Sequence, residues 1–399
     1  MVRFRLGGGA KEKTRGERMS MTSTADPRGA TNPLFSANKL KLGIFGTNVS
    51  NGCAITTAEA AYALNWPNTL SLAELADRSG YEAVVPVARW KGFGGKSNFN
   101  GTNFETYTWA AGLSQATKRV AILTTSHVPT VHPVMAAKQA ATVDHIGNGR
   151  FALNIVCGWF RPELEMFGAP LMEHDMRYEY AAEWIEIVKL LWTREEEFDY
   201  EGKFLRVTKG FSMPKPIQKP FPPLMNAGAS GKGQRFAAKY ADMAFIHIDG
   251  SDLERTRAHV ESYRRIAREE FGREIQIWSG APVVQRDTMK EAQDYARYYA
   301  VEKGDDEAVE NLLRIQNIEM HKLVPEKAEQ LRYVAKLGWG GFPLIGTPDH
   351  IVDGLQKLSK IGIDGVLLRW LDYWDGMARW QKEVMPRLEQ AGLRRPAAA

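Results

Sequence analysis

Short apolar segments alternate with amphipathic segments along most of the chain. From residue 40 onward, eight runs rich in β-branched and aromatic residues have the length and composition of buried strands. These predicted strands comprise residues 40–46, 82–89, 120–126, 151–157, 222–228, 243–248, 275–280 and 365–371. The segments between them space their apolar residues as helices do, and residues 177–192, for example, place Trp184, Val188 and Leu191 on one face.

Eight strands, each followed by a helix, predict a closed (β/α)8 barrel, or TIM barrel, as one domain over residues 39–399. A doubly wound open sheet is the alternative. It is disfavoured because the eight units leave no strand over and no G-x-G-x-x-G motif follows the first strand. Residues 49–68 and 281–346 do not fit the repeat, and we expect these insertions to cover the C-terminal ends of the strands, where reactive groups of such barrels lie.

The first 38 residues differ from the rest in composition. They hold seven lysines and arginines against three acidic residues, whereas the whole chain of 399 residues has a net charge of +5. Because they are rich in Gly, Ser and Thr and lack apolar periodicity, residues 1–38 are predicted to be a disordered basic leader, or an over-long start with Met19 or Met21 as the initiator. The remaining chain is nearly neutral, so we expect no nucleic-acid partner.

Membrane, secreted and metal-dependent proteins are disfavoured by the same composition. No apolar run approaches the ~20 residues of a membrane span, and the N-terminus lacks the apolar centre of a secretory signal, so a cytoplasmic protein is predicted. Cys53 and Cys157 lie far apart without metal-ligand spacing, and His127 and His132 are five residues apart. We therefore predict reduced thiols, no metal site, and cleft or helix-capping roles for both histidines.

Two polar positions at predicted strands point to a site. Asn154 is a carboxamide within an apolar strand, so it bonds either to neighbouring backbone or to a ligand, and the residues alone leave both open. Ser230 and Gly231 lie where a strand turns into a helix, and the amides of a helix N-terminus bind anions unless they form a plain cap. The segment is not a P-loop, because Gly233 replaces the required Ser or Thr.

Several motifs resemble those of the bacterial luciferase-like, FMN-dependent monooxygenases. The central motif is AAKQAATVDHIGNGRFALNIVCGWFRPELEMFG at residues 136–168, and the others are WKGFGGKSNFNGTNFETYTWAAGL at 90–113, Arg177-Tyr178, and LIGTPDHIVDGL at 344–355. Within this family the chain is most similar to the pyrimidine and dimethylsulfone monooxygenases. The resemblance covers nearly everything after residue 39 and implies a (β/α)8 barrel that binds reduced FMN.

The resemblance also implies roles for individual residues. Flavin-contacting positions of the family match Ala88, Arg89, Asn154 and Glu163, and phosphate-side positions match Arg177, Tyr178 and Ser230, with the amide of Gly231 beside them. Thr125 matches a threonine near the oxygen-reactive face, so Thr125 and Asn154 are the expected catalytic residues. The pair Ala88-Arg89 departs from an Ile-Lys pair in the pyrimidine enzymes, which leaves the substrate open.

The activity implied is a two-component oxygenation. A separate NAD(P)H:flavin reductase would supply reduced FMN, O2 would be the co-substrate, and a small heterocycle, organosulfur compound or halogenated aromatic would be oxygenated. A deazaflavin (F420)-dependent oxidoreductase of the same superfamily and a flavin-binding protein without turnover are the alternatives, and the family suggests a homodimer or tetramer. Because the reaction must exclude water, we expect an aromatic lining. The candidates for it are Trp90, Phe93, Trp159, Phe160, Trp278 and Trp370.

Overall fold

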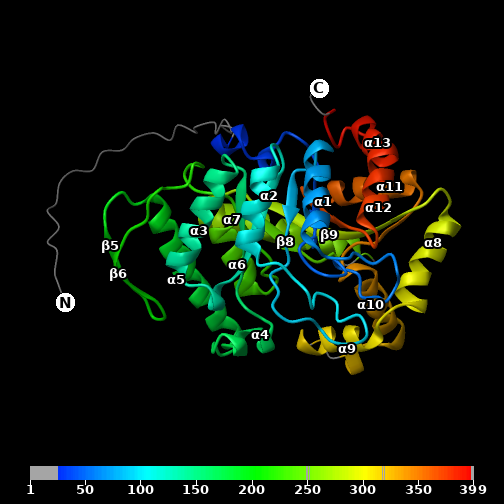
Figure 1. Ribbon diagram of the computed structural model, residues 1–399, viewed down its shortest axis with the longest axis horizontal. Coiled ribbons are helices and arrows are strands. Elements are labelled where there is room, and N and C mark those ends of the chain that lie inside the picture. The colour runs from blue at the N-terminus through cyan, green and yellow to red at the C-terminus, as the bar shows by residue number, and fades with distance from the viewer. Residues whose placement is uncertain (1–25, 249, 251, 317, 319, 397–399) are drawn as a thin grey trace, which may run out of the picture.

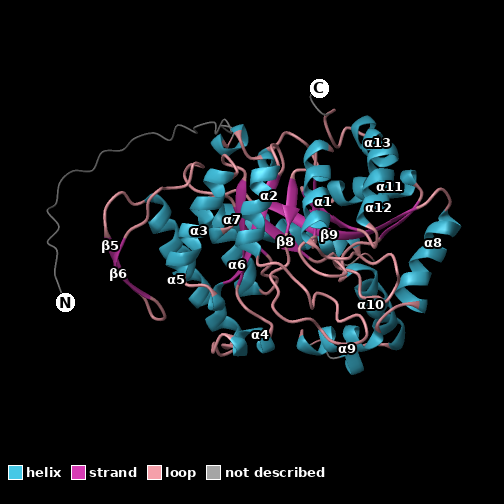
Figure 2. Ribbon diagram, in the orientation of Figure 1, coloured by secondary structure: helices cyan, strands magenta, loops and turns pink. Residues whose placement is uncertain are grey.

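Eight parallel strands form a closed barrel in the computed structural model, which describes residues 26–396 apart from 249, 251, 317 and 319. Each strand pairs with the next around the ring, and the last pairs with the first. In ring order they are β1 (Lys41–Phe45), β2 (Ala83–Val85), β3 (Ala121–His127), β4 (Phe151–Val156), β7 (Leu224–Asn226), β8 (Met243–Ile246), β9 (Gln276–Gln285) and β11 (Gly365–Arg369). All eight predicted strands, and the predicted barrel, are confirmed (Figure 2).

Helices surround this barrel (Figure 1). The helices between and after the strands are α1 (Trp66–Arg78), α2 (Thr106–Ala116), α3 (Pro133–Ile146), α5 (His174–Thr193), α6 (Gly231–Tyr240), α7 (Leu253–Phe271), α11 (Pro348–Lys360), α12 (Tyr373–Arg379) and α13 (Met385–Gln390). In α5 the predicted apolar face is buried, and the indole Nε1 of Trp184 donates to the carbonyl of Val131 at 2.7 Å. Helix α5 is thereby fixed against the loop before α3, which matters because α5 carries predicted site residues.

The expectation of a disordered leader over residues 1–38 is wrong for residues 26–38, which pack on the N-terminal end of the barrel. They form two short 3-10 helices, η1 (Pro27–Ala30) and η2 (Pro33–Phe35). Arg28 pairs with Asp242 at 2.8 Å, and Leu34 is fully buried in the barrel interior with residues of seven strands. This segment therefore closes the bottom of the barrel, whereas residues 1–25 lie outside the described residues.

The larger insertion lies at the opposite end of the strands, as predicted. It contains α8 (Met289–Arg297), the π-helix η4 (Tyr298–Glu302), α9 (Asp306–Ile315), the 3-10 helix η5 (Met320–Lys322), α10 (Pro325–Gly338) and β10 (Leu344–Gly346). β10 was not predicted, because it is three residues long and its partner among the described strands is the extension of β9 beyond the barrel. The smaller insertion meets the larger one through a bridge between Thr56 and Gly304.

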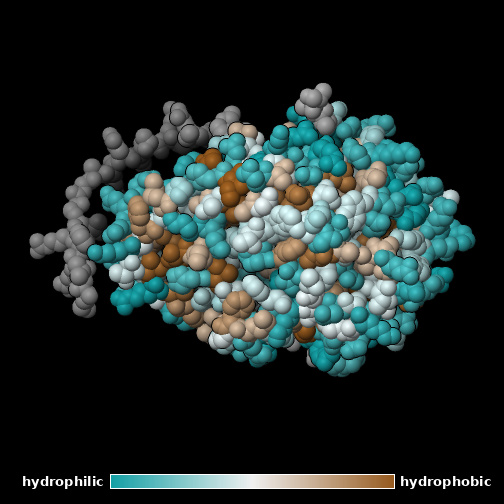
Figure 3. Space-filling view, in the orientation of Figure 1, coloured by the Kyte–Doolittle hydropathy of each residue, from teal (hydrophilic) through white to brown (hydrophobic). Residues whose placement is uncertain are grey.

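The remaining elements are short. They are η3 (Val128–Thr130), α4 (Arg161–Met166), the antiparallel pair β5 (Phe198–Glu201) and β6 (Arg206–Gly210), and η6 (Trp380–Val384). Figure 3 shows a mixed surface with apolar side chains gathered near α3 and α5. Large exposed apolar side chains in this region include Met135 on α3 and Met213, whose carbonyl accepts a hydrogen bond from Lys138 of α3. Within residues 26–396 as described, no helix has the length and apolarity to cross a membrane.

Candidate active site

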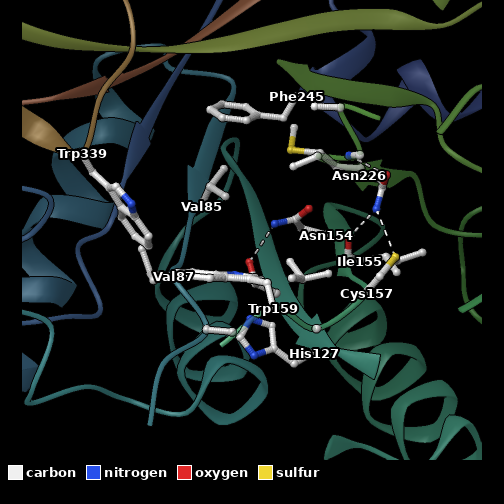
Figure 4. A pocket seen from close by; sticks show the side chains of 18 of the residues that line it. Val85, Val87, His127, Asn154, Ile155, Cys157, Trp159, Asn226, Phe245 and Trp339 are labelled. Carbon is white, nitrogen blue, oxygen red and sulfur yellow. Dashed lines mark hydrogen bonds between the residues drawn. The ribbon is translucent and has the colours of Figure 1, made fainter. Parts of the chain in front are cut away.

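A cavity of about 570 Å³ opens at the C-terminal ends of the barrel strands. Its floor is apolar and includes Val85, Met225, Phe245 and Leu367 from β2, β7, β8 and β11. Its outer wall comes from the larger insertion, which contributes Ile315, Gln316 and Trp339. Figure 4 shows Asn154 between Trp339 on one side and Asn226 and Cys157 on the other. This size and apolar character are typical of small-ligand sites.

Thr125 and Asn154 lie directly opposite each other on β3 and β4, as the strand order predicted. Asn154 Nδ2 donates to Thr125 Oγ1 at 3.2 Å, and Thr125 Oγ1 donates to the carbonyl of Pro86 at 2.8 Å. The Thr125 hydroxyl proton is therefore already donated to Pro86, and the hydroxyl oxygen holds the Asn154 side chain in this arrangement. Asn154 Oδ1 is buried and has no partner among the described residues.

Ala88 and Arg89 also line the cavity, whereas Glu163 lies behind them. Glu163 is fully buried, accepts the backbone amide of Trp90 at 2.7 Å, and lies 3.3 Å from the guanidinium of Arg89. The expected direct contact between Glu163 and a flavin is not supported by this position. Glu163 instead holds the turn that carries Arg89.

Burial and charge set the protonation of this cluster. Burial lowers the pKa of Arg89 to about 10, against the opposing effect of Glu163, so Arg89 is cationic at neutral pH. Burial acts to raise the pKa of Glu163, but His127, Arg89 and the Trp90 amide together lower it, so the carboxylate is ionised. Burial and the charge of Arg89 lower the pKa of His127, which outweighs the attraction of Glu163. His127 is thus neutral, with Nδ1 3.5 Å from Glu163.

The aromatic lining was predicted only in part. Trp159 lines the cavity, and Phe93 and Phe160 stack beside it. Together with Trp339 these rings enclose the Arg89 guanidinium, whose Cζ lies 5.0 to 5.6 Å from their centroids. The other three predictions are wrong: Trp278 is buried inside the barrel, Trp370 packs on Tyr373 and Trp380, and Trp90 packs on Phe167.

Arg177 and Tyr178, on the first turns of α5, form the edge of the cavity next to the N-terminus of α6. Arg177 Nη1 donates to the carbonyl of Gly158 at 2.9 Å, while its buried Nε has no partner in the described part of the chain. Ser230 caps α6 by accepting the amide of Gly233 at 3.1 Å. Ser230 and Gly231 do not line the cavity themselves; they flank it beside Ala229, which does.

Three polar lining residues at or just after strand ends were missed by sequence reasoning. Asn226 Nδ2 donates to the carbonyl of Ile155 at 2.8 Å and its Oδ1 accepts the amide of Gly228, which shapes the turn into α6. His247 directly follows the apolar strand β8, and Arg369 is the last residue of the apolar strand β11. A polar residue at the C-terminal end of a barrel strand is the signal that identifies such positions.

Comparison with known proteins agrees with this geometry. Residues 41–365 match the family described as luciferase-like monooxygenase. The chain belongs to that family. The matched span runs from the first residue of β1 to the first residue of β11, and so includes the walls that carry Asn154 and Arg177.

Individual relatives of this luciferase-like chain have stated activities. It is 29% identical over 368 residues to an FMNH2-dependent dimethylsulfone monooxygenase of Pseudomonas putida, covering 90% of this chain and 98% of that protein. It is 26% identical over 352 residues to a pyrimidine monooxygenase of Acinetobacter baylyi, covering 87% and 94%. A solved structure of a long-chain alkane monooxygenase shares the fold, with a TM-score of 0.76, 20% identity, and coverage of 91% and 94%. The predicted similarity to pyrimidine and dimethylsulfone monooxygenases is confirmed.

Proposed function

We propose that this luciferase-like protein is the oxygenase of a two-component system, which uses reduced FMN and O2 to oxygenate a small organic substrate. The observation that carries the proposal is the cavity itself, which combines a cationic edge at Arg177 with an apolar floor and the carboxamide of Asn154. The relatives are FMNH2-dependent dimethylsulfone and pyrimidine monooxygenases, which favours the same cofactor here. The substrate of this chain is left to experiment.

The residues present fit the phosphate of FMN. Arg177 has an unused, buried Nε, and no described carboxylate lies within ion-pair distance of its guanidinium. The nearby Lys232 instead approaches Asp175 and Glu179 of α5. A Cβ at Gly231 would meet no atom within 4 Å, so the amides at the start of α6 are approachable. A cation beside a helix N-terminus is the arrangement that binds a phosphate.

The remaining residues fit the flavin ring system and its chemistry. Bound reduced FMN would supply the electrons with which O2 oxygenates the substrate. The chain would hold the ring over Val85, Met225 and Leu367 and keep water out with Trp159 and Trp339. The Asn154 carboxamide lies at the cavity and gives one of its two N–H donors to Thr125, so its second N–H would face the oxygen that gains charge, and Thr125 would act as the positioning residue that fixes the amide.

Two partners complete the proposal. A separate NAD(P)H:flavin reductase would deliver reduced FMN, in line with the FMNH2 dependence of the dimethylsulfone relative. A second copy of the chain would form the predicted dimer or tetramer. Exposed apolar residues near α3, such as Met135 and Met213, give one candidate contact surface. Sedimentation of the full chain, with Met135→Glu as the variant, tests this surface.

The test of the function begins with anaerobic titration of reduced FMN into the full chain, followed by O2 uptake with and without candidate substrates. We expect saturable binding of reduced FMN and product formation that requires O2. Product formation with reduced deazaflavin in the absence of O2 would contradict the proposal and support hydride transfer. Flavin binding without turnover of any heterocycle, organosulfur compound or halogenated aromatic would support a binding protein.

A further inference from the structure

Arg369, the last residue of β11, carries a buried charge that the described residues leave unpaired. It is 4% exposed, and no carboxylate of the described residues lies within ion-pair distance. Among the described residues, its guanidinium donates one hydrogen bond to an oxygen, from Nη2 to the carbonyl of Gly340 at 2.8 Å, and its buried Nε has no partner there. A buried, unpaired charge is costly, so a guanidinium in this state needs a further acceptor.

Three other buried arginines, Arg89, Arg150 and Arg394, have more partners than Arg369. Arg150 also lacks a carboxylate, but its guanidinium donates to four acceptors of the helix α2 end and the following loop, at 2.8 to 3.1 Å. Arg394 is held by Glu82 at 2.8 Å, and Arg89 by Glu163 at 3.3 Å. Each of these three arginines therefore has a carboxylate or four acceptors, whereas the described residues give Arg369 one carbonyl.

Glycines keep the guanidinium of Arg369 open to the cavity. Gly280 of β9 and Gly341, after α10, line the cavity beside it. A Cβ at Gly280 would lie 2.8 Å from Arg369 Nη2, and a Cβ at Gly341 would collide with the same atom. Gly341 also has a φ of +94°, which side chains rarely adopt. Any side chain at either position would therefore cover or displace the guanidinium.

The charges around the cavity are arranged on two sides. Arg89, Arg177 and Arg369 line it together with three histidines, and no Asp or Glu is among the described lining residues. Glu163 neutralises Arg89 from behind. Arg177 belongs to α5, which follows β4, whereas Arg369 ends β11. Strands β7, β8 and β9 lie between β4 and β11 in the ring. Arg369 thus faces the site across the barrel mouth from the phosphate edge.

We propose that Arg369 binds the anionic group of the substrate, so that the enzyme oxygenates a small organic carboxylate or sulfonate. This inference rests on the proposed function, because it assigns Arg177 to the FMN phosphate and leaves Arg369 for the substrate. The planar guanidinium fork suits two oxygens of such a group. Phe245, Trp339 and Ile315 line the same cavity and would contact the apolar remainder.

His247 lies in the same part of the wall and supports this assignment. Burial and the charge of Arg369 lower the pKa of His247, so it is neutral at physiological pH. A neutral imidazole can donate a hydrogen bond to the anion. It carries no charge, so it leaves Arg369 as the cation that binds the anion in this part of the wall. The thiol of Cys53 is also close to the guanidinium, but burial raises its pKa to about 11, so it is no counter-ion.

The experiment compares matched probes that differ in charge but hardly in shape. The full chain, saturated with FMN, is titrated calorimetrically with benzenesulfonate and with methyl phenyl sulfone, in which a methyl group replaces the charged oxygen. Benzoate and benzamide form the carboxylate pair. We expect the anion of at least one pair to bind roughly ten- to a hundredfold more tightly than its neutral partner, the range for a hydrogen bond to a charged group.

Variants of Arg369 identify the residue responsible. Arg369→Met should abolish the preference for the anion, and Arg369→Lys should keep part of it, because lysine retains the charge without the fork. Arg257→Met removes the same charge from an exposed position of α7 and should leave the preference unchanged. FMN affinity should be the same in all four proteins, because Arg369 is remote from the phosphate edge.

Three results would overturn the inference. They are equal binding of both members of each pair by the wild type, an anion preference that survives in Arg369→Met, and an FMN affinity that falls with this variant. The wild-type comparison decides the question even where Arg369→Met does not fold. Two separate titrations distinguish this inference from the proposed function. Failure of the protein to bind FMN contradicts the proposed function. Equal binding of the paired probes, measured with and without FMN, contradicts the role of Arg369.

Discussion

The Asn154 carboxamide is fixed by Thr125, whose Oγ1 accepts a hydrogen bond from Asn154 Nδ2 at 3.2 Å. The hydroxyl of Thr125 in turn donates to the carbonyl of Pro86 at 2.8 Å, so the direction of this chain of bonds is set by the backbone of the neighbouring strand end. No described residue donates a hydrogen bond to Asn154 Oδ1. The pair therefore works as one oriented amide rather than as two equivalent donors.

Replacing Asn154 with leucine tests that orientation. Leucine is nearly isosteric, so Asn154→Leu should keep the fold and the affinity for reduced FMN. The rate of product formation should fall by roughly 10², the usual cost of losing one hydrogen-bonding group at a developing charge. Single-turnover kinetics of the fully loaded enzyme measures this rate. A lower melting temperature with an unchanged rate per loaded enzyme would show that Asn154 is structural.

The matching change at Thr125 should act through Asn154. Thr125→Val removes the acceptor for Asn154 Nδ2, so we expect a smaller fall in rate than for Asn154→Leu, while Thr125→Ser keeps the hydroxyl and should restore most of the rate. The double variant Thr125→Val, Asn154→Leu should be no slower than Asn154→Leu alone, because residues that act together are not additive. Independent, multiplying losses would contradict a shared role.

Arg177 tests the phosphate edge. Arg177→Ala should weaken FMN binding by about 1.5 to 3 kcal/mol, the range for hydrogen bonds to a charged group. Calorimetric titration measures the loss, and Arg177→Lys should recover part of it through the retained charge. Lys232→Ala is the control, because Lys232 approaches Asp175 and Glu179 rather than the cavity. Equal FMN affinity in Arg177→Ala and wild type would remove Arg177 from the site.

Leu34 tests the closure of the barrel by residues 26–38. Its side chain is fully buried between residues of the barrel interior, so Leu34→Ala should lower the free energy of unfolding by about 2 to 5 kcal/mol. Urea denaturation measures this change. A chain that begins at Lys39 should be destabilised at least as much, because it also loses the ion pair of Arg28 with Asp242. Unchanged stability of that shortened chain would show that residues 26–38 are dispensable for folding.

His127 and Glu163 predict the response to acid. The pKa of His127 is lowered from 6.5 in the folded protein, so the unfolded chain takes up the proton first, and the stability of the folded state declines as the pH falls below about 6.5. The pKa of Glu163 is lowered from 4.5, so its contribution is present above that pH and is lost below it.

His127→Asn should therefore remove the earlier part of this acid loss. Urea denaturation of the flavin-free protein at pH 7.5 and pH 5.5 compares the two proteins, and the wild type should lose more stability between these values than the variant does. The pKa of His247 is lowered in both proteins, so its contribution has the same direction in both and cancels in the comparison. An equal loss in wild type and variant would mean that His127 is already protonated in the folded state.

The strands were predictable because their signal is local. Each barrel strand is a run of β-branched and apolar residues, and the order of the runs fixes which strand ends meet, so the adjacency of Thr125 and Asn154 followed from the sequence. The packing of residues 26–38 did not follow, because its partners are distant: Arg28 meets Asp242 across 214 positions. The three-residue β10 was missed for the same reason, since its partner is the far end of β9.

Side-chain direction was the other limit. Glu163 was placed against a flavin by resemblance, yet it lies behind Arg89, because three donors of the 89–91 turn converge on its carboxylate. Trp278 and Arg369 both belong to strands that reach the cavity. Trp278 lies near the start of β9 and fills the barrel, whereas Arg369 ends β11 and reaches the mouth. Position along the strand separates these two outcomes, and strand ends are uncertain from sequence alone.

In the function that we propose, this protein uses reduced FMN to insert oxygen from O2 into a small organic substrate. The most direct test is mass spectrometry of the product formed by the full chain with FMN, a flavin reductase and NADH under 18O2. We predict one 18O atom in each product molecule, and none when the label is supplied as water instead. A product that carries no oxygen from 18O2, or that forms without O2 from a reduced deazaflavin, would contradict the claim.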